Sequence, residues 1–422
     1  NSTGSNNTAV GYFALNANTT GISNTAVGDT ALDANTTGQQ NTALGRGALG
    51  DNVSGSYNTA LGRSALNANT GSNNTAVGYR SSQNNTSGGF NTSLGQDSLY
   101  SNTTGAQNVA IGYSALENNT TANNNTAVGY QAGYANTSGS LVAVGYRAGY
   151  SQTTGGSNTH IGYRSGESNT GNDNTSLGNT SLFVNTTGSQ NTALGRDALY
   201  HNTTASSNTA VGYLALYDNT TGDNNTIVGR SAGANITTAS GNTFIGKGAG
   251  ESVTTGAKNT VIGLFNGNQG GLNITTSSNN IVLSDGDGNP RQYIDSSGNV
   301  LVGTTTTATA SDSGWYIRPN GNSVYKETGT TAHDFLEFYR GTDGSMSRVG
   351  FIRTDGTSTS YNTSSDYRLK ENVVDITGAT DRLKQLQPKR FNFIADADTT
   401  VDGFLAHEVS DIVPEAITGT KD

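Results

Sequence analysis

The sequence predicts an all-β protein whose larger part is a repetitive parallel β-roll, or β-solenoid, built of 17-residue rungs. Two observations predict this fold. A glycine recurs at nearly constant spacing through the first two-thirds of the chain, and the residues before each glycine alternate with the two-residue period of a strand. A repeat this short cannot be a domain, so each one is expected to form one coil of a stacked rod. A small β domain and a C-terminal α+β segment are expected to follow.

Sixteen glycines mark the repeat, and successive ones lie 17 residues apart except for three intervals of 16. They are Gly11, Gly28, Gly45, Gly62, Gly78, Gly95, Gly112, Gly129, Gly145, Gly162, Gly178, Gly195, Gly212, Gly229, Gly246 and Gly263. Each closes a short run of the Asn-Thr-Ala-Val-Gly type. Glycine is expected here because it permits a backbone angle or a close approach of two backbones that other residues do not.

A single rung illustrates the expected coil. Thr209 and Val211 point to one face of the strand and Ala210 points to the other. We expect inward Val, Ile and Leu to form apolar ladders from rung to rung, and Thr and Asn to form hydrogen-bonded ladders. A second apolar pair follows at 215–216, and the Asn-Thr-Thr-Gly cluster at 219–222 has the chemistry of a turn.

The rod is expected to associate with copies of itself. Stacked at about 4.8 Å, the rungs would give a rod of roughly 75 Å. Each rung supplies few apolar side chains, which is a thin core for one chain. Several copies around a common axis would bury more apolar surface, so we expect a parallel homotrimer.

The composition excludes several classes of function. Only 13% of the 422 residues are charged, and the net charge is −9, so the electrostatic footprint of nucleic-acid binding is missing. The chain has no cysteine, and no apolar run approaches the ~18 residues of a membrane span. We therefore expect no cofactor, no metal, no nucleic-acid partner and no membrane insertion. Because Asn1 stands in mid-repeat without Met, we take the chain to be a fragment or a processed product.

Three parts are expected along the chain: a repeat shaft over 1–271, a β-rich connector domain over 272–361 and a third part over 362–422. In the connector, Asp-Gly and Ser-Gly pairs separate alternating runs, a pattern typical of β-hairpins. In the third part the charge rises. Segment 380–386 is expected to form a short amphipathic helix, and 390–394 a strand.

The repeats resemble the head repeats of trimeric autotransporter adhesins, which form a left-handed parallel β-roll. The resemblance rests on the Asn-Thr-Ala-Val-Gly runs, although the adhesin repeats are usually shorter and read Ser-Val-Ala-Ile-Gly. Related arrays occur in bacteriophage tail fibres. The stretch 293–300 also resembles segments that precede chaperone tails in phage fibres.

The third part resembles the intramolecular chaperone domain called peptidase S74, which phage endosialidases and other tail fibres carry. Four blocks match in order: Ser-Ser-Asp-Tyr-Arg-Leu-Lys-Glu-Asn-Val at 364–373, Leu-Lys-Gln-Leu-Gln-Pro at 383–388, Gly-Phe-Leu-Ala-His-Glu-Val at 403–409 and Val-Pro-Glu-Ala at 413–416. The family trimerises its fibre and then cuts itself free. Because the family domain normally continues into longer helical sequence, the domain is expected to be truncated here.

This resemblance implies Ser365 as the nucleophile of self-cleavage and Lys370 as the base that activates it. A serine hydroxyl is a poor nucleophile until a nearby base takes its proton, and a lysine does so when burial lowers its pKa. The bond cut is expected between Ser365 and Asp366, with Asp366 and Arg368 orienting the strand. The alternative is a loop serine and a surface lysine without chemistry.

Three short motifs resemble ligand sites but lack a required residue. The run 241–248 has no Ser or Thr after the lysine of a phosphate loop, and Gly246 is already explained by the repeat. The run 285–289 starts like a calcium loop but is followed by proline, so a hairpin tip explains it better. The His-Glu pair at 407–408 lacks the second histidine of a zinc helix, since Asp411 stands there.

Two sets of residues recur along the repeats and are candidates for sugar attachment or for sugar contact. Asn-x-Thr or Asn-x-Ser acceptors occur at most turns, and we interpret them as turn chemistry, with glycosylation as the alternative. They are Asn18, Asn35, Asn85, Asn102, Asn119, Asn136, Asn185, Asn202 and Asn219. Tyrosines that follow repeat glycines are interpreted as a packing ladder, with contact to receptor sugars as the alternative. They are Tyr12, Tyr79, Tyr113, Tyr130, Tyr146, Tyr163 and Tyr213.

Together these observations predict a structural fibre protein that attaches to a cell surface through a receptor, expected to be a glycan. It would be extracellular, on a virion tail fibre or a cell-surface appendage, and trimerised by its C-terminal chaperone. The alternative is a bacterial trimeric adhesin or an extracellular filament subunit. A glycan hydrolase is disfavoured because the rungs hold almost no Glu for paired carboxylates. Any enzyme activity would be a single-turnover self-cleavage.

Overall fold

The computed structural model describes residues 3–137, 139–305, 314–317, 323–326, 333–342, 345–354, 359–363, 371–394 and 396–416. Contacts divide the chain into two units, 1–328 and 329–422, and each unit is described by itself. The predicted division at 271 and 361 stays a prediction.

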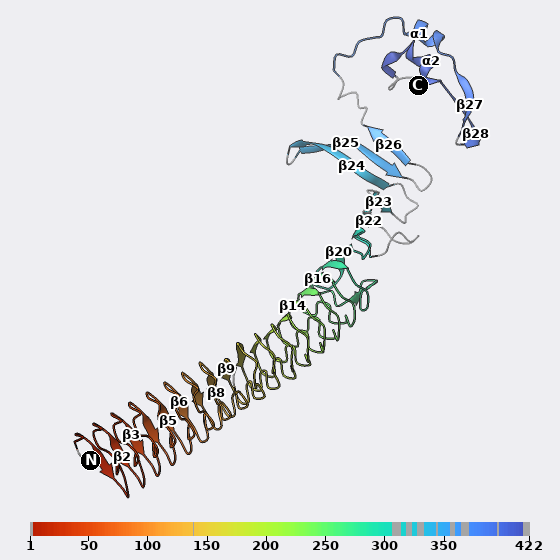
Figure 1. Cartoon of the computed structure of the whole chain (residues 1–422). Coiled ribbons are helices and arrows are strands. Elements are labelled where there is room, and N and C mark those ends of the chain that lie inside the picture. Colours follow the sequence, from red (N-terminus) through yellow and green to blue (C-terminus); the bar gives the residue numbers. More distant parts are fainter. Residues whose placement is uncertain are drawn as a thin grey trace. The chain divides into compact units, whose positions relative to one another are not determined.

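The first unit is a parallel β-solenoid in which each rung contributes one short strand to a continuous sheet (Figure 1). The strands are β1 (Thr8–Val10), β2 (Thr25–Val27), β3 (Thr42–Leu44), β4 (Thr59–Leu61), β5 (Thr75–Val77), β6 (Thr92–Leu94), β7 (Val109–Ile111), β8 (Thr126–Val128), β9 (Leu141–Val144), β10 (Asn158–Ile161), β11 (Thr175–Leu177), β12 (Thr192–Leu194), β13 (Thr209–Val211), β14 (Thr226–Val228), β15 (Thr243–Ile245) and β16 (Thr260–Ile262). Equivalent residues pair from rung to rung, as Thr192 does with Thr209. The predicted fold and its 17-residue rungs are confirmed.

The repeat glycines are required for both predicted reasons. Gly212 has a φ of +137°, a conformation that side chains with a Cβ rarely adopt. A Cβ on Gly212 would lie 2.4 Å from the carbonyl oxygen of Gly229 in the next rung. Stacking at the spacing of a sheet therefore leaves no room for a side chain at this position.

The prediction for the inward face of the strand is wrong. The central residue of each strand points inward, so that Ala210 is fully buried while Thr209 and Val211 remain partly exposed. The narrow interior is filled instead by a leucine from the following turn, such as Leu216. Because that leucine takes most of the volume, the central strand position is usually restricted to alanine.

The exceptions to this pattern are compensated within the rung. Where Phe244 replaces the central alanine, Gly250 replaces the turn leucine, and a Cβ there would lie 2.2 Å from the phenylalanine ring. His160 and Gly166 form a second such pair, also at 2.2 Å. In these rungs a larger central residue is thus combined with a glycine in the turn, which leaves room for its ring.

Two polar layers separate three apolar clusters in the interior. One cluster ends at Ala76, the next runs from Leu99 to Ala148, and the last begins at Leu182. Between the first two, buried serines bond one another, with Ser82 and Ser93 Oγ atoms 2.8 Å apart. The second polar layer contains the buried His160.

Asparagine and threonine ladders hold the rungs in register, as predicted. Buried Asn102 donates to Oδ1 of Asn85 at 2.6 Å and to the carbonyl oxygen of Gly105 at 2.9 Å, and it accepts from Nδ2 of Asn119 at 2.8 Å. The hydroxyl of Thr203 donates to the carbonyl oxygen of Thr220 at 2.9 Å. These bonds connect each rung to its neighbours.

After the last rung the sheet changes from parallel to antiparallel. Strand β19 (Ile281–Ser284) still pairs in parallel with β16, and the antiparallel strands β20 (Pro290–Ile294), β21 (Val300–Val302), β22 (Gly314–Ile317) and β23 (Ser323–Lys326) follow. The short strands β17 (Asn268–Gln269) and β18 (Leu272–Asn273) form a separate pair. The hairpins predicted at the Asp-Gly and Ser-Gly pairs are confirmed.

The second unit contains two small sheets and two short helices. Strands β24 (His333–Thr342), β25 (Ser345–Thr354) and β26 (Thr359–Thr363) form one sheet, and β27 (Lys389–Phe393) and β28 (Asp396–Gly403) form the other. The other elements among the described residues of this unit are helix α1 (Ala379–Gln385), helix α2 (Ala406–Ser410) and the 3-10 turn η2 (Pro414–Ala416). The predicted helix and strand lie within one residue of α1 and β27. Among the described residues, no helix has the length and hydropathy to cross a membrane.

Candidate functional site

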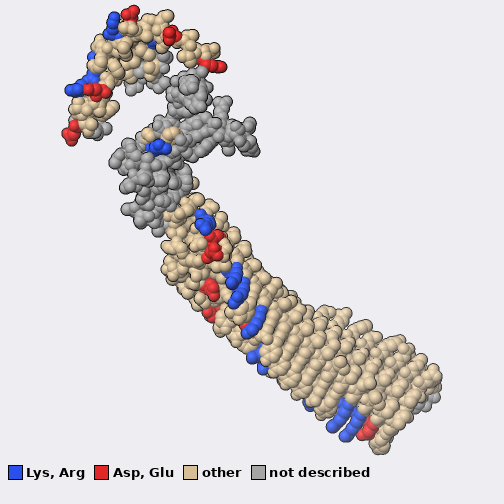
Figure 2. All heavy atoms as spheres, turned by 180° about the vertical axis from the view of Figure 1, so that it is seen from behind, with Lys and Arg blue, Asp and Glu red and all other residues tan. Residues whose placement is uncertain are grey.

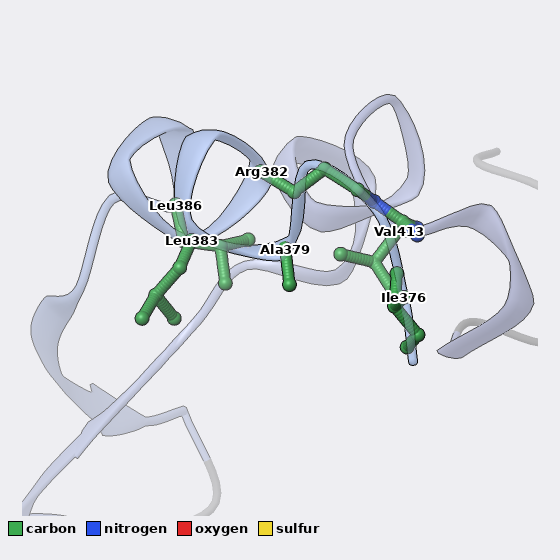
Figure 3. A pocket seen from close by; sticks show the side chains of 6 residues that line it. All are labelled: Ile376, Ala379, Arg382, Leu383, Leu386 and Val413. Atoms are coloured by element: carbon green, nitrogen blue, oxygen red, sulfur yellow. The ribbon is translucent and has the colours of Figure 1, made fainter. Parts of the chain in front are cut away.

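The C-terminal segment 371–416 forms a shallow apolar hollow beneath α1 (Figure 3). The hollow has a volume of about 170 Å³ and is lined by Ile376, Ala379, Arg382, Leu383, Leu386 and Val413. Arg382 connects α1 to the residues that follow α2, since its Nε donates to the carbonyl oxygen of Ile412 at 3.0 Å. The apolar side chains of this lining face the hollow.

The same segment exposes most of its large apolar residues. The exposed fractions are 79% for Val373, 81% for Val374 and 104% for Ile394. Neither α1 nor α2 contains a buried residue. Exposed apolar surface of this extent is typical of an interaction site.

The predicted cleavage residues come just before the segment 371–416 in the sequence. Ser365, Asp366, Arg368 and Lys370 lie outside the described residues, so their roles stay predictions.

A second candidate surface was missed by the sequence reasoning. We call it the outer strand face: the first and third residues of the aligned triplets in β1–β16, which are Thr or Val followed by Val, Leu or Ile. The exposed fractions of Val228, Ile245 and Ile262 are 36%, 41% and 44%. The sequence feature that could have indicated this face is the alanine at the centre of most strands, because alanine fits a narrow interior better than valine does.

Four of the seven tyrosines after the repeat glycines form a packing ladder, as interpreted, whereas Tyr79 and Tyr213 contact arginines instead. Tyr113, Tyr130, Tyr146 and Tyr163 stack at ring-centroid distances of 5.1–5.2 Å and with nearly parallel planes. A sugar would stack on the face of such a ring. Because neighbouring tyrosines cover these faces, the ladder offers mainly ring edges and hydroxyls.

The asparagines of the Asn-x-Thr turns are structural. Asn18 is almost fully buried, and the other eight candidates are fully buried. Asn219, for example, donates to Oδ1 of Asn202 at 2.9 Å and to the carbonyl oxygen of Gly222 at 3.0 Å. An amide held inside the coil is not accessible for glycosylation, so the alternative of a sugar-lined ridge is wrong.

The calcium-like run at 285–289 is a hairpin tip. Asp285 accepts from the backbone NH groups of Asn289 at 2.9 Å and Asp287 at 3.0 Å, and from Arg291. The Asn289 backbone bond, with the further donors, holds the pKa of Asp285 well below its usual range. Within the described ranges, no cluster of three His, Asp or Glu has the arrangement of a metal site.

Comparison with known families identifies the C-terminal segment. Residues 365–418 match the family described as Peptidase S74, chaperone of endosialidase. No curated protein and no solved structure matches the chain. The chain thus contains a β-solenoid body and a C-terminal S74 chaperone domain, a domain typical of trimeric proteins of the tail-fibre and endosialidase type.

Proposed function

We propose that this chain is the subunit of a homotrimeric, extracellular fibre that attaches to a cell surface. The solenoid is the spacer of the fibre, and the S74 domain is the device that brings three chains into register. After assembly, the Ser365 hydroxyl attacks the carbonyl carbon of the Ser365–Asp366 peptide bond while Lys370 takes its proton. The bond to the Asp366 nitrogen breaks as that nitrogen receives the proton from Lys370, and water then hydrolyses the ester, so that the chaperone is released. The observation that carries the proposal is the S74 match at the end of a long solenoid.

The exposed apolar residues of the C-terminal segment support association. A segment of fewer than 60 residues with no buried helical residue lacks the core needed for a stable independent fold. Two further copies would cover Val373, Val374 and the hollow beneath α1. Burial of such side chains stabilises an interface by roughly 25 cal/mol per Å² of apolar surface.

The outer strand face supports a trimer along the shaft. It repeats the same uncharged Thr and Val, Leu or Ile pattern over sixteen strands. A surface that repeats along an axis matches the equivalent surface of identical chains arranged around that axis. Because every rung presents the same pattern, the shaft alone does not fix the register, and the chaperone supplies it.

Light scattering tests the assembly on the uncut Ser365→Ala chain. We expect a mass close to three times 43.3 kDa. A double variant of the outer strand face, Ile245→Lys with Ile262→Lys, should weaken the trimer, whereas Thr221→Lys in an exposed turn should not. A monomeric uncut chain would contradict the proposal.

Attachment is tested with the labelled trimer on a panel of bacterial strains. We expect retention by at least one strain, and loss of retention after periodate oxidation of the surface glycans. Retention by none of the strains would contradict the attachment role while leaving the fibre assembly intact.

A further inference from the structure

Two neighbouring rungs carry basic side chains that have no acidic partner. Arg230 and Lys247 each follow a repeat glycine directly and are exposed. Several other arginines of the shaft are paired with acids, as in the Arg46–Asp29 and Arg80–Asp97 ion pairs, whereas Arg63 and Lys258 form no ion pair within the described residues and line no such hollow. Within the described part of the solenoid, Arg230 and Lys247 form no ion pair, so their charges are available to a ligand. Figure 2 shows several basic side chains following one another along one side of the shaft, with acidic side chains near some of them.

These two residues line a polar hollow of about 200 Å³ together with Ser231, Gly248 and Glu251. The hollow spans two rungs on the segment that follows the strand. It is therefore separate from the outer strand face, and it remains compatible with association of the shaft through that face.

The position of the arginine is supported by an aromatic ring. The guanidinium carbon of Arg230 lies 6.0 Å from the ring centroid of Tyr213, and that of Arg196 lies 5.5 Å from the same ring. Such cation–π contacts hold a guanidinium group in place at modest energetic gain. Arg230 thus presents its fork of N–H donors beside the hollow.

The combination of groups selects a class of ligand. Arginine binds a carboxylate or a sulfate with two parallel hydrogen bonds, and lysine adds a point charge. The Glu251 carboxylate would repel a simple anion but would accept hydrogen bonds from hydroxyl groups, and the Ser231 hydroxyl donates or accepts. A ligand that carries both an anionic group and several hydroxyls satisfies all of them.

We propose that this hollow, formed by Arg230, Ser231, Lys247, Gly248 and Glu251, binds an acidic sugar. Arg230 and Lys247 bind the carboxylate or sulfate, and Glu251 accepts from the sugar hydroxyls. This inference rests on the proposed attachment function and names the chemical class of its receptor. The net charge of −9 argues against a general polyanion surface, so one acidic group is bound locally.

Calorimetric titration of the full chain with three sugars on one scaffold tests the site: lactose, 3′-sialyllactose and lactose 3′-sulfate. We expect binding of at least one acidic sugar and none of lactose. Arg230→Gln and Lys247→Gln should each weaken binding about tenfold or more. Arg63→Gln is the matched control, because Arg63 also lies over a tyrosine ring, that of Tyr79, at 5.7 Å.

Glu251→Gln separates a sugar site from a simple anion site. It should weaken binding of the acidic sugar and strengthen binding of inorganic sulfate. No binding of either acidic sugar, equal binding of lactose, or an equal loss in Arg63→Gln would overturn the inference. If cell attachment persists in the Arg230→Gln chain, this inference fails while the proposed function stands, whereas a monomeric chain that attaches to no cell refutes the proposed function itself.

Discussion

The solenoid and the S74 segment differ in whether their side chains find contacts within the same chain. In the solenoid, buried asparagines such as Asn102 find their partners in adjoining rungs of the same chain. In the segment 371–416, Val373, Val374 and Ile394 project from the chain without a covering layer. The solenoid thus satisfies its buried polar groups within one chain, whereas the C-terminal segment leaves apolar side chains exposed. This difference fits a spacer joined to an assembly device.

The largest effect is expected from removing the cleavage dyad, which would keep the chaperone joined to the solenoid. Ser365→Ala and Lys370→Ala should each reduce self-cleavage by more than about 10³-fold, because the nucleophile or its base is lost. A denaturing gel measures this as persistence of the longer band. Ser364→Ala is the control and should be processed normally. Equal processing of all variants would exclude the dyad.

A substitution at a repeat glycine should damage the solenoid without affecting the chaperone. In Gly212→Val, a disallowed backbone angle combines with a clash against Gly229, and we expect a loss of at least about 3 kcal/mol. Hydrogen exchange should show lost protection in the neighbouring rungs. Gly286→Ala is the control, because nothing lies within 4 Å of its added Cβ. Equal protection in both variants would contradict the close-stacking explanation.

Acid should weaken the solenoid at its second polar layer. Burial lowers the pKa of His160 from 6.5 to about 4. Between these values the unfolded chain binds a proton that the folded chain does not, so stability falls as the pH falls from 6.5 to 4. The expected loss is up to about 3 kcal/mol. Denaturant unfolding at several pH values measures it.

A double variant tests this explanation by giving the rung the alanine and leucine that most rungs have. His160→Ala with Gly166→Leu removes the titrating ring and fills its space, so this part of the pH dependence should disappear. His201→Ala, at a partly exposed histidine, should retain it. An unchanged pH profile in the double variant would assign the acid effect to other groups.

The smallest of these effects is expected from interrupting one asparagine ladder. Asn102→Ala leaves donors and acceptors of Asn85, Gly105 and Asn119 without this partner, at an expected cost of about 1–3 kcal/mol. The exposed Asn235→Ala should change stability by less than about 0.5 kcal/mol. Similar unfolding curves for the two variants would show that the ladder contributes little.

The sequence by itself determined the repeat, the solenoid and the S74 domain, because each depends on local spacing or on ordered motifs. Gly212 and its equivalents fix the coil length, since stacked backbones leave no space for a Cβ there. The hairpin at Asp285 was equally predictable from its turn residues.

Only the tertiary structure decided which strand face is inward. Alternation separates Thr209 and Val211 from Ala210 but does not say which side meets the core, and the turn leucine settles this by filling the interior. The same stacking holds Leu216 at a φ of +53°, against the local preference of leucine. The hollow between Arg230 and Lys247 likewise exists because winding brings residues 17 apart in the sequence into adjacent rungs.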